Sequence, residues 1–141
     1  MTSTEKAELR ALITRHEGYR RFPYQCSSGK ITIGVGRNLE DVGIDEEEAR
    51  YLLDRDIARA YVDLASSFSW FELLDRVRQR ALVDMRFQLG GTGLRGFAGM
   101  LDALAVGDFD TAAEECLDSR YARQTPARAG EIARMLRTGV A

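Results

Sequence analysis

One short stretch of this chain is patterned as β-strand, and helical patterns flank it on both sides. Residues 22–25 and 30–35 are extended runs separated by the turn-forming residues 27–29. In the second run the apolar side chains alternate with Thr32 and Gly34, which is typical of a strand with one packed face. We therefore expect a two-stranded hairpin with Thr32 pointing away from the packed face. Because only this short stretch has a strand pattern, we expect an α+β fold that is mostly helical.

Helical patterns account for the rest of the chain. Apolar spacing predicts a first helix from about residue 4 to Glu17, ended by Gly18. A connecting loop is expected over residues 37–43, after which Asp45 and Glu48 form a start signal for a long helix. Further helices are expected near residues 77–89, 97–106, 109–117 and 126–138. These elements predict one domain over residues 1–141. A small hairpin-bearing lobe with the connecting long helix spans about 1–65, and an all-helical lobe spans about 66–141.

Cysteine content and the first residues narrow the chemistry and the location. Cys26 and Cys116 are too few for a disulfide framework, and no cluster of cysteine or histidine suggests a metal site. We expect free thiols, no metal and no cofactor. Residues 1–15 contain no apolar run that can serve as a signal-peptide core or a membrane anchor. The expectation is a product that accumulates in the cytoplasm without a membrane anchor.

The charge is unevenly distributed along the chain. The formal net charge is -2, yet residues 40–56 carry an excess of six acidic groups and residues 119–141 an excess of four basic groups. A basic end can lie on an anionic polymer, although solvated helix faces have the same pattern. Binding to nucleic acid is disfavoured by the sequence pI of about 5.5 and by the lack of a basic stripe along the middle helices.

Three side chains around the hairpin suit hydrolysis of a glycosidic bond. That reaction needs a proton donor for the leaving oxygen and a group on the opposite face that directs water or attacks the sugar. Glu17 suits the donor role, because apolar packing and the negative end of a helix dipole favour a protonated carboxyl. Cys26 can supply the second group if cations such as Lys30 or Arg37 lower its pKa. Thr32 can hydrogen-bond a water molecule.

The spacing of these residues resembles the active-site signature of phage-type lysozymes, glycoside hydrolase family 24. In that signature Glu is followed after eight residues by Asp or Cys and after five more by Thr, and here these are Glu17, Cys26 and Thr32. The motif Ile-Gly-x-Gly follows at residues 33–36, and further matches lie at residues 87–97 and 119–129. The resemblance implies a lysozyme-like fold. Because the segment over residues 37–44 is shorter than in well-known members, we expect the small lobe to be little more than its hairpin.

The resemblance also implies an activity. It suggests an endolysin-like muramidase that cleaves the β-1,4 bond between N-acetylmuramic acid and N-acetylglucosamine in peptidoglycan, with Glu17 as general acid, Cys26 in place of the usual Asp, and Thr32 positioning water. Phe87, Gln88 and Arg128 match residues that line the cleft, and Arg37 is a further candidate for substrate contact.

The same resemblance implies a monomer that acts on the wall in the periplasm or outside the cell, after release through a membrane lesion.

Two other functions are alternatives to the muramidase. One is a catalytically weak peptidoglycan-binding or structural module with the same fold, which the cysteine at position 26 allows. The other pairs Cys26 with His16, the only histidine, as a cysteine peptidase. It is disfavoured because the histidine of cell-wall cysteine peptidases follows the cysteine in the chain.

Overall fold

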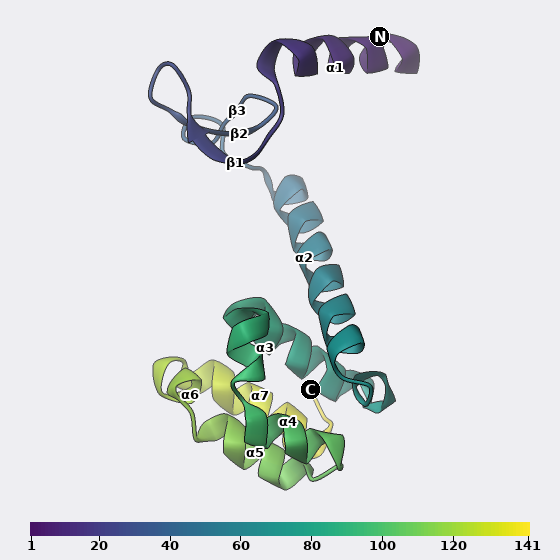
Figure 1. Ribbon diagram of the computed structural model, residues 1–141, viewed down its shortest axis with the longest axis vertical. Helices are drawn as coiled ribbons and strands as arrows, with labels where there is room; N and C mark the ends of the chain where they lie inside the picture. Colours follow the sequence, from purple (N-terminus) through teal and green to yellow (C-terminus); the bar gives the residue numbers. More distant parts are fainter. The chain divides into compact units, whose positions relative to one another are not determined.

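The computed structural model describes residues 1–141 and is mostly helical with one small antiparallel sheet (Figure 1). This confirms the expected α+β class. The chain divides into two compact units, Met1–Tyr51 and Leu52–Ala141. The first holds α1 (Ser3–Glu17), β1 (Arg20–Gln25), β2 (Ile31–Gly34), β3 (Arg37–Asn38) and the start of α2 (Glu46–Ser67). The second holds the rest of α2, η1 (Phe71–Leu73), α3 (Arg76–Arg95), α4 (Ala98–Ala105), α5 (Phe109–Leu117), α6 (Arg120–Gln124) and α7 (Pro126–Thr138). The single domain with lobes that divide near residue 65 stays a prediction.

Helix α1 begins and ends at the expected signals. The Thr2 hydroxyl accepts a hydrogen bond from the Glu5 amide at 3.2 Å, and the Glu5 carboxylate accepts one from the Thr2 amide at 2.6 Å. This reciprocal pair satisfies two amides that have no partner inside the helix. At the other end Gly18 has a φ of +74°, and its amide donates to the Thr14 carbonyl. Glu17 is therefore fixed as the last residue of α1.

The sheet has three antiparallel strands in the order β1-β2-β3, so β2 is the central strand. The two-residue strand β3 lies in the segment expected to be a loop, and the small unit is therefore more than a hairpin. Thr32 pairs in register with Tyr24 on one side and Asn38 on the other. Side chains of directly opposed residues share a face of the sheet, so these neighbours flank Thr32.

The prediction that Thr32 points away from the packed face of β2 was wrong. Thr32 is only 3% exposed, whereas Ile31 is 42% exposed. The alternation in the sequence identified the two faces of the strand correctly. It did not identify which face is buried. The third strand, which places Asn38 beside Thr32, was not expected either. Thr32 is consequently a covered residue of the sheet.

The second unit is built around one apolar core. Phe71, Leu82, Met85, Met100 and Leu136 are fully buried and come from η1, α3, α4 and α7. The core accounts for most of the cohesion of this unit, since buried apolar side chains are the main favourable term in folding.

Glycine residues mark helix boundaries in this unit, as the sequence predicts. Gly90 has a φ of +74° and a ψ of 170° and interrupts α3 at the expected end, but the helix resumes and runs to Arg95. Gly139 ends α7 in the left-handed conformation, and Cys116 is buried on α5, both as expected. The short elements η1 and α6 were not predicted. No helix combines the length and the apolar character that crossing a lipid bilayer requires.

Candidate active site

Glu17 lies at the end of α1 and is solvent-exposed, which differs from the apolar setting expected for it. The reason is that α1 buries none of its residues within the first unit. The Glu17 carboxylate instead lies against the backbone of Gly36, in the turn between β2 and β3. A Cβ atom placed on Gly36 would be 2.8 Å from Oε2 of Glu17. The end of α1 and this turn therefore meet at the carboxylate.

Cys26 opens the turn between β1 and β2. Its amide donates to the Lys30 carbonyl at 2.9 Å, and its carbonyl accepts from the Gly29 amide at 2.8 Å. The sulfur lies 3.0 Å from the Ser28 hydroxyl. Both backbone groups of Cys26 are bonded within the turn, so its backbone is held there. The thiol is half-buried and reduced.

The pKa of the Cys26 thiol is lowered to about 7, chiefly by the Ser28 hydroxyl and then by the amides of Ser28 and Lys30. Thr32 adds a smaller lowering through its side chain. Hydrogen bonds to the sulfur favour the thiolate, so close to half of the thiol is ionised near neutral pH. The lowering was expected, but nearby cations were named as its cause. That attribution was wrong, because hydrogen-bond donors of the turn dominate.

Lys30 and Arg37, the two cations expected to act on Cys26, are each paired with carboxylates. Lys30 Nζ lies 3.3 Å from Asp41 and 3.7 Å from Glu40. Both groups of each pair are well exposed, so these contacts add little stability. Their effect is to leave Lys30 with nearby negative charge. This explains why Lys30 does not determine the ionisation of Cys26.

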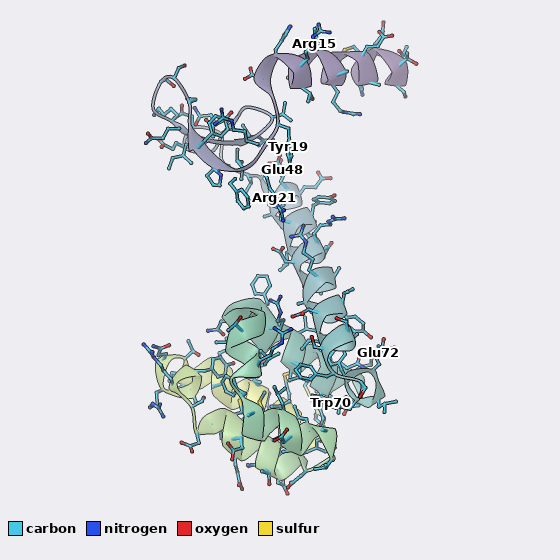
Figure 2. The ribbon with its side chains drawn as sticks, in the orientation of Figure 1. Arg15, Tyr19, Arg21, Glu48, Trp70 and Glu72 are labelled. Atoms are coloured by element: carbon cyan, nitrogen blue, oxygen red, sulfur yellow. The ribbon has the colours of Figure 1, made fainter.

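Arg37 joins β3 to the start of α2. Its guanidinium donates to both carboxylate oxygens of Glu48 and, at 3.1 Å, to the Gly43 carbonyl. Glu48, labelled at the start of α2 in Figure 2, also accepts from the Asp45 amide, and Asp45 accepts from the Glu48 amide. The expected start signal of α2 is thus confirmed. Gly36 precedes Arg37 in the chain. The bonds of the Arg37 guanidinium to Glu48 and Gly43 therefore help to hold the turn that contains Gly36.

The Thr32 hydroxyl donates to the Lys30 carbonyl at 3.0 Å. The same carbonyl accepts from the Cys26 amide, so Thr32 supports the turn that carries the thiol. Cys26 and Thr32 are therefore brought together on the hairpin. The single proton of the Thr32 hydroxyl is directed at this carbonyl and not at open solvent.

The remaining candidates lie in the second unit. Phe87 and Arg128 line a cavity of about 740 Å³ whose other walls come from α2 and α3, while Gln88 is exposed and is not part of this lining. Arg128 Nε donates to Asp84 at 2.9 Å. This hydrogen bond raises the pKa of Arg128, and the pair joins α7 to α3. Phe87 and Arg128 thus line the same cavity, and the substrate contacts expected of these two residues and of Gln88 stay predictions.

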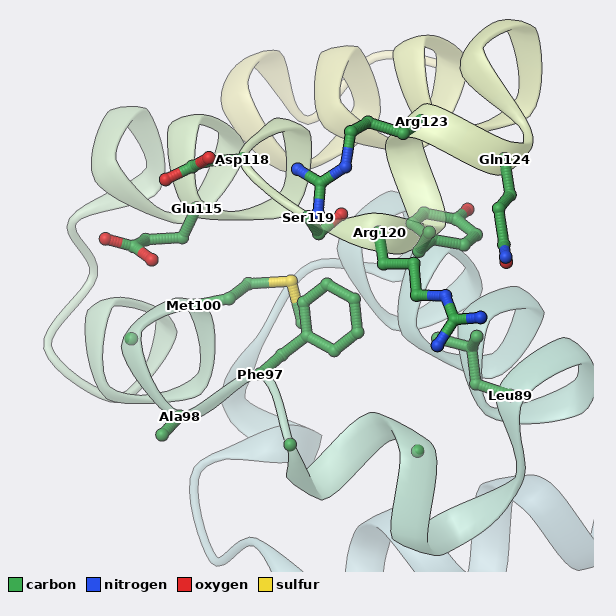
Figure 3. A pocket seen from close by; sticks show the side chains of 14 residues that line it. Leu89, Phe97, Ala98, Met100, Glu115, Asp118, Ser119, Arg120, Arg123 and Gln124 are labelled. Atoms are coloured by element: carbon green, nitrogen blue, oxygen red, sulfur yellow. The ribbon is translucent and has the colours of Figure 1, made fainter.

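A second cavity in this unit, of about 670 Å³, was not predicted as a site (Figure 3). Glu115 and Asp118 line it from the end of α5, and Arg120 and Arg123 line it from α6. Phe97 and Met100 also line it. Acidic, basic and apolar side chains therefore line one cavity. The sequence signalled only the basic half, through the positive excess near the C-terminus.

Known proteins resemble this chain in sequence. The phage lysozyme family profile matches residues 14–135, a range that takes in Glu17, Cys26 and Thr32. An endolysin of Acyrthosiphon pisum secondary endosymbiont phage 1 is 33% identical over 74% of this chain and 71% of that protein. Probable T4-type lysozyme 1 of Dictyostelium discoideum is 22% identical over 94% of this chain and 95% of that protein.

A third relative is much longer than this chain. The pre-baseplate central spike protein Gp5 of Enterobacteria phage T4 is 31% identical over 91% of this chain, which spans 27% of that spike protein. Relatives of different length therefore share this unit of sequence. Since the family profile covers well over half of the residues, the chain belongs to the phage lysozyme family.

Proposed function

We propose that this chain is an endolysin-like muramidase that hydrolyses the β-1,4 bond between N-acetylmuramic acid and N-acetylglucosamine in peptidoglycan. The family match over residues 14–135 carries the proposal, because it supplies the glycosidase class. The relatives named endolysin and T4-type lysozyme support the same class. In this proposal the protein acts as a monomer on the cell wall, outside the cytoplasm in which it is made.

Glu17 is the proposed general acid. Its carboxylate is exposed at the end of α1, where a sugar oxygen can approach it. In the reaction it donates its proton to the leaving oxygen as the bond from that oxygen to the anomeric carbon breaks. If Cys26 attacks the anomeric carbon, Glu17 then accepts the proton of the water that displaces the sulfur. If Cys26 instead accepts the proton of the attacking water, proton exchange with solvent restores the Glu17 acid and the thiolate for the next cycle.

Cys26 is the proposed partner on the opposite face of the sugar. With a pKa of about 7, its thiolate is present at neutral pH in a useful fraction. It either accepts a proton from the attacking water or attacks the anomeric carbon itself, and in the second case water later displaces the sulfur. Thr32 supports this group through the Lys30 carbonyl, and Arg37 supports the neighbouring turn.

The cavities of the second unit support a peptide-bearing glycan as the substrate. Peptidoglycan carries short peptides with both ammonium and carboxylate groups. Glu115 and Asp118, together with Arg120 and Arg123, offer complementary charges for such a chain. We propose that Arg128, Phe87 and the exposed Gln88 contact the glycan.

A second candidate is a peptidoglycan-binding or structural module with the same fold. The similarity to a central spike protein favours it, since that relative is named for its place in a phage particle. This candidate predicts binding to the wall without bond cleavage.

The test is release of soluble fragments from purified peptidoglycan, with mass analysis of the new reducing ends. Wild type should release fragments that end in N-acetylmuramic acid, and Glu17→Gln should release none. Glu8→Gln is the matched control, because it makes the same substitution at another exposed position of α1. Cys26→Ala should lower the rate, and Cys26→Asp should restore much of it. If wild type releases nothing but sediments with the wall, the structural module replaces the muramidase.

A further inference from the structure

The Glu17 carboxylate rests on one glycine of the turn between β2 and β3. A Cβ atom on Gly36 would lie 2.8 Å from Oε2, 3.0 Å from Cδ and 3.1 Å from Cγ of Glu17. Separations below 3.0 Å do not occur for real Cβ atoms, so one of the two groups would have to move. Cγ, Cδ and Oε2 of Glu17 therefore occupy space that is free only because residue 36 has no side chain.

A second glycine two residues earlier provides the comparison. Gly34 has a φ of +68° and Gly36 a φ of +67°, and both values favour glycine over residues with a side chain. A Cβ atom on Gly34, however, would meet nothing within 4 Å. Gly34 is therefore explained by its backbone conformation alone. Gly36 has a second reason to be glycine, which is its contact with Glu17.

We propose that Gly36 is a positioning residue for Glu17: the bare backbone of the turn determines where the carboxylate lies. The inference rests on the proposed function, in which Glu17 is the general acid. Within residues 1–51 no side chain makes a hydrogen bond or an ion pair with the Glu17 carboxylate, so close packing on Gly36 is the constraint that this unit supplies. Arg37, the next residue, anchors the same turn to Glu48 and Gly43.

The displacement that a methyl group would cause follows from the distances. Ordinary van der Waals contact begins at 3.4 Å, so Oε2 would have to move by about 0.6 Å from its place at 2.8 Å. Because Oε2 is the far end of a flexible side chain, the move is small in its effect on folding. It is large for catalysis, since misplacing a catalytic group by about 1 Å can reduce the rate on the order of a hundredfold.

The experiment compares Gly36→Ala with the matched control Gly34→Ala. Both variants place alanine at a positive φ and should lose similar thermal stability, measured as the shift in Tm. With peptidoglycan as substrate, kcat of Gly36→Ala should be on the order of tenfold lower than that of Gly34→Ala, with KM unchanged. Equal kcat values for the two variants, or a change confined to KM, would overturn the proposal. If Glu17→Gln keeps wild-type activity, the proposed function itself is wrong.

A further variant covers the case in which Gly36→Ala does not fold. The double substitution Glu17→Ala with Gly36→Ala removes the contacting side chain, so it should fold with the same Tm as Glu17→Ala with Gly34→Ala. Recovery of folding in this pair shows that the contact with Glu17 caused the loss. Failure of the double variant to fold, while its Gly34 counterpart folds, shows that another constraint makes Gly36 a glycine and overturns the proposal.

Discussion

Replacing Arg78 by alanine should destabilise the helical unit more than any other single arginine substitution in α3. The side chain of Arg78 is only 11% exposed and meets the end of α7. Its Nε donates to the Leu136 carbonyl at 2.6 Å and its Nη2 to the Arg137 carbonyl at 2.9 Å. Its guanidinium carbon also lies 3.4 Å from the centre of the Phe109 ring. One side chain therefore ties α3 to α5 and α7.

The expected loss is about 3 to 5 kcal/mol in the free energy of unfolding. Two hydrogen bonds from a charged donor contribute most of it, at about 1.5 kcal/mol or more each. The contact with Phe109 adds about 1 kcal/mol. Arg78 Nη1 also pairs with Asp75 at 2.7 Å, but Asp75 is 41% exposed and this pair adds little. Folded domains are stable by only about 5 to 15 kcal/mol, so the loss is a large part of the total.

Urea denaturation followed by fluorescence measures this loss directly. Trp70 is the only tryptophan and packs on the core of the helical unit, so its emission reports unfolding of that unit. Arg80→Ala is the control, because Arg80 is an exposed arginine two residues further along the same helix. If the free energies of unfolding of Arg78→Ala and Arg80→Ala agree within about 0.5 kcal/mol, the reasoning from these contacts is refuted.

The same pair of proteins should also differ in pH dependence. Burial alone would raise the pKa of Asp75, but the hydrogen bonds from Arg78 outweigh burial and hold the pKa below its usual range. A carboxyl with a lowered folded-state pKa contributes stability above its unfolded pKa, near 3.9. That contribution disappears as pH decreases through the folded pKa. The difference in unfolding free energy between wild type and Arg78→Ala should therefore shrink slightly in acid, by the small contribution of the Asp75 pair, and the larger part from the contacts with α5 and α7 should remain.

Two more results are expected in the first unit. The rate at which iodoacetamide alkylates Cys26 should rise with pH, with a midpoint near pH 7, and Ser28→Ala should move this midpoint upward. Cys116 is buried and its pKa is raised to about 11, so it should stay unreactive in the folded protein. An unchanged midpoint in Ser28→Ala contradicts the assigned cause. Arg37→Met should speed hydrogen exchange in β3 and at the start of α2, because the bonds of Arg37 to Glu48 are lost; unchanged protection would show that these bonds do not hold the turn.

Local signals in the sequence were sufficient for the helix ends. Glu17, Asp45 and Gly139 lie at boundaries set by capping groups or by a positive φ within a few residues of chain. Such signals act through neighbouring backbone amides, so they can be recognised without knowing the rest of the fold. The kink at Gly90 shows their limit, because α3 resumes beyond this glycine and runs to Arg95.

The facing of β2 could not be predicted because it depends on a partner strand. Strand β3 has only two residues, too few for an alternating pattern, yet it makes β2 central and places Asn38 beside Thr32. The cause of the acidity of Cys26 was missed for a similar reason. Charged residues near a cysteine are visible in a sequence, whereas the direction of the Ser28 hydroxyl and of two amides depends on the turn conformation.

The source of that acidity bears on how Cys26 can replace a carboxylate. A thiolate stabilised by a neighbouring cation is sensitive to salt, whereas one stabilised by the hydroxyl and amides of its own turn is not, because these donors are fixed in contact with the sulfur. The sulfur also titrates near pH 7, where an Asp at the same position would be fully ionised. Activity of the wild type should therefore rise between pH 6 and 8 if the thiolate is required, and activity of Cys26→Asp should not. A rise of equal size in both proteins would assign the ionisation to another group.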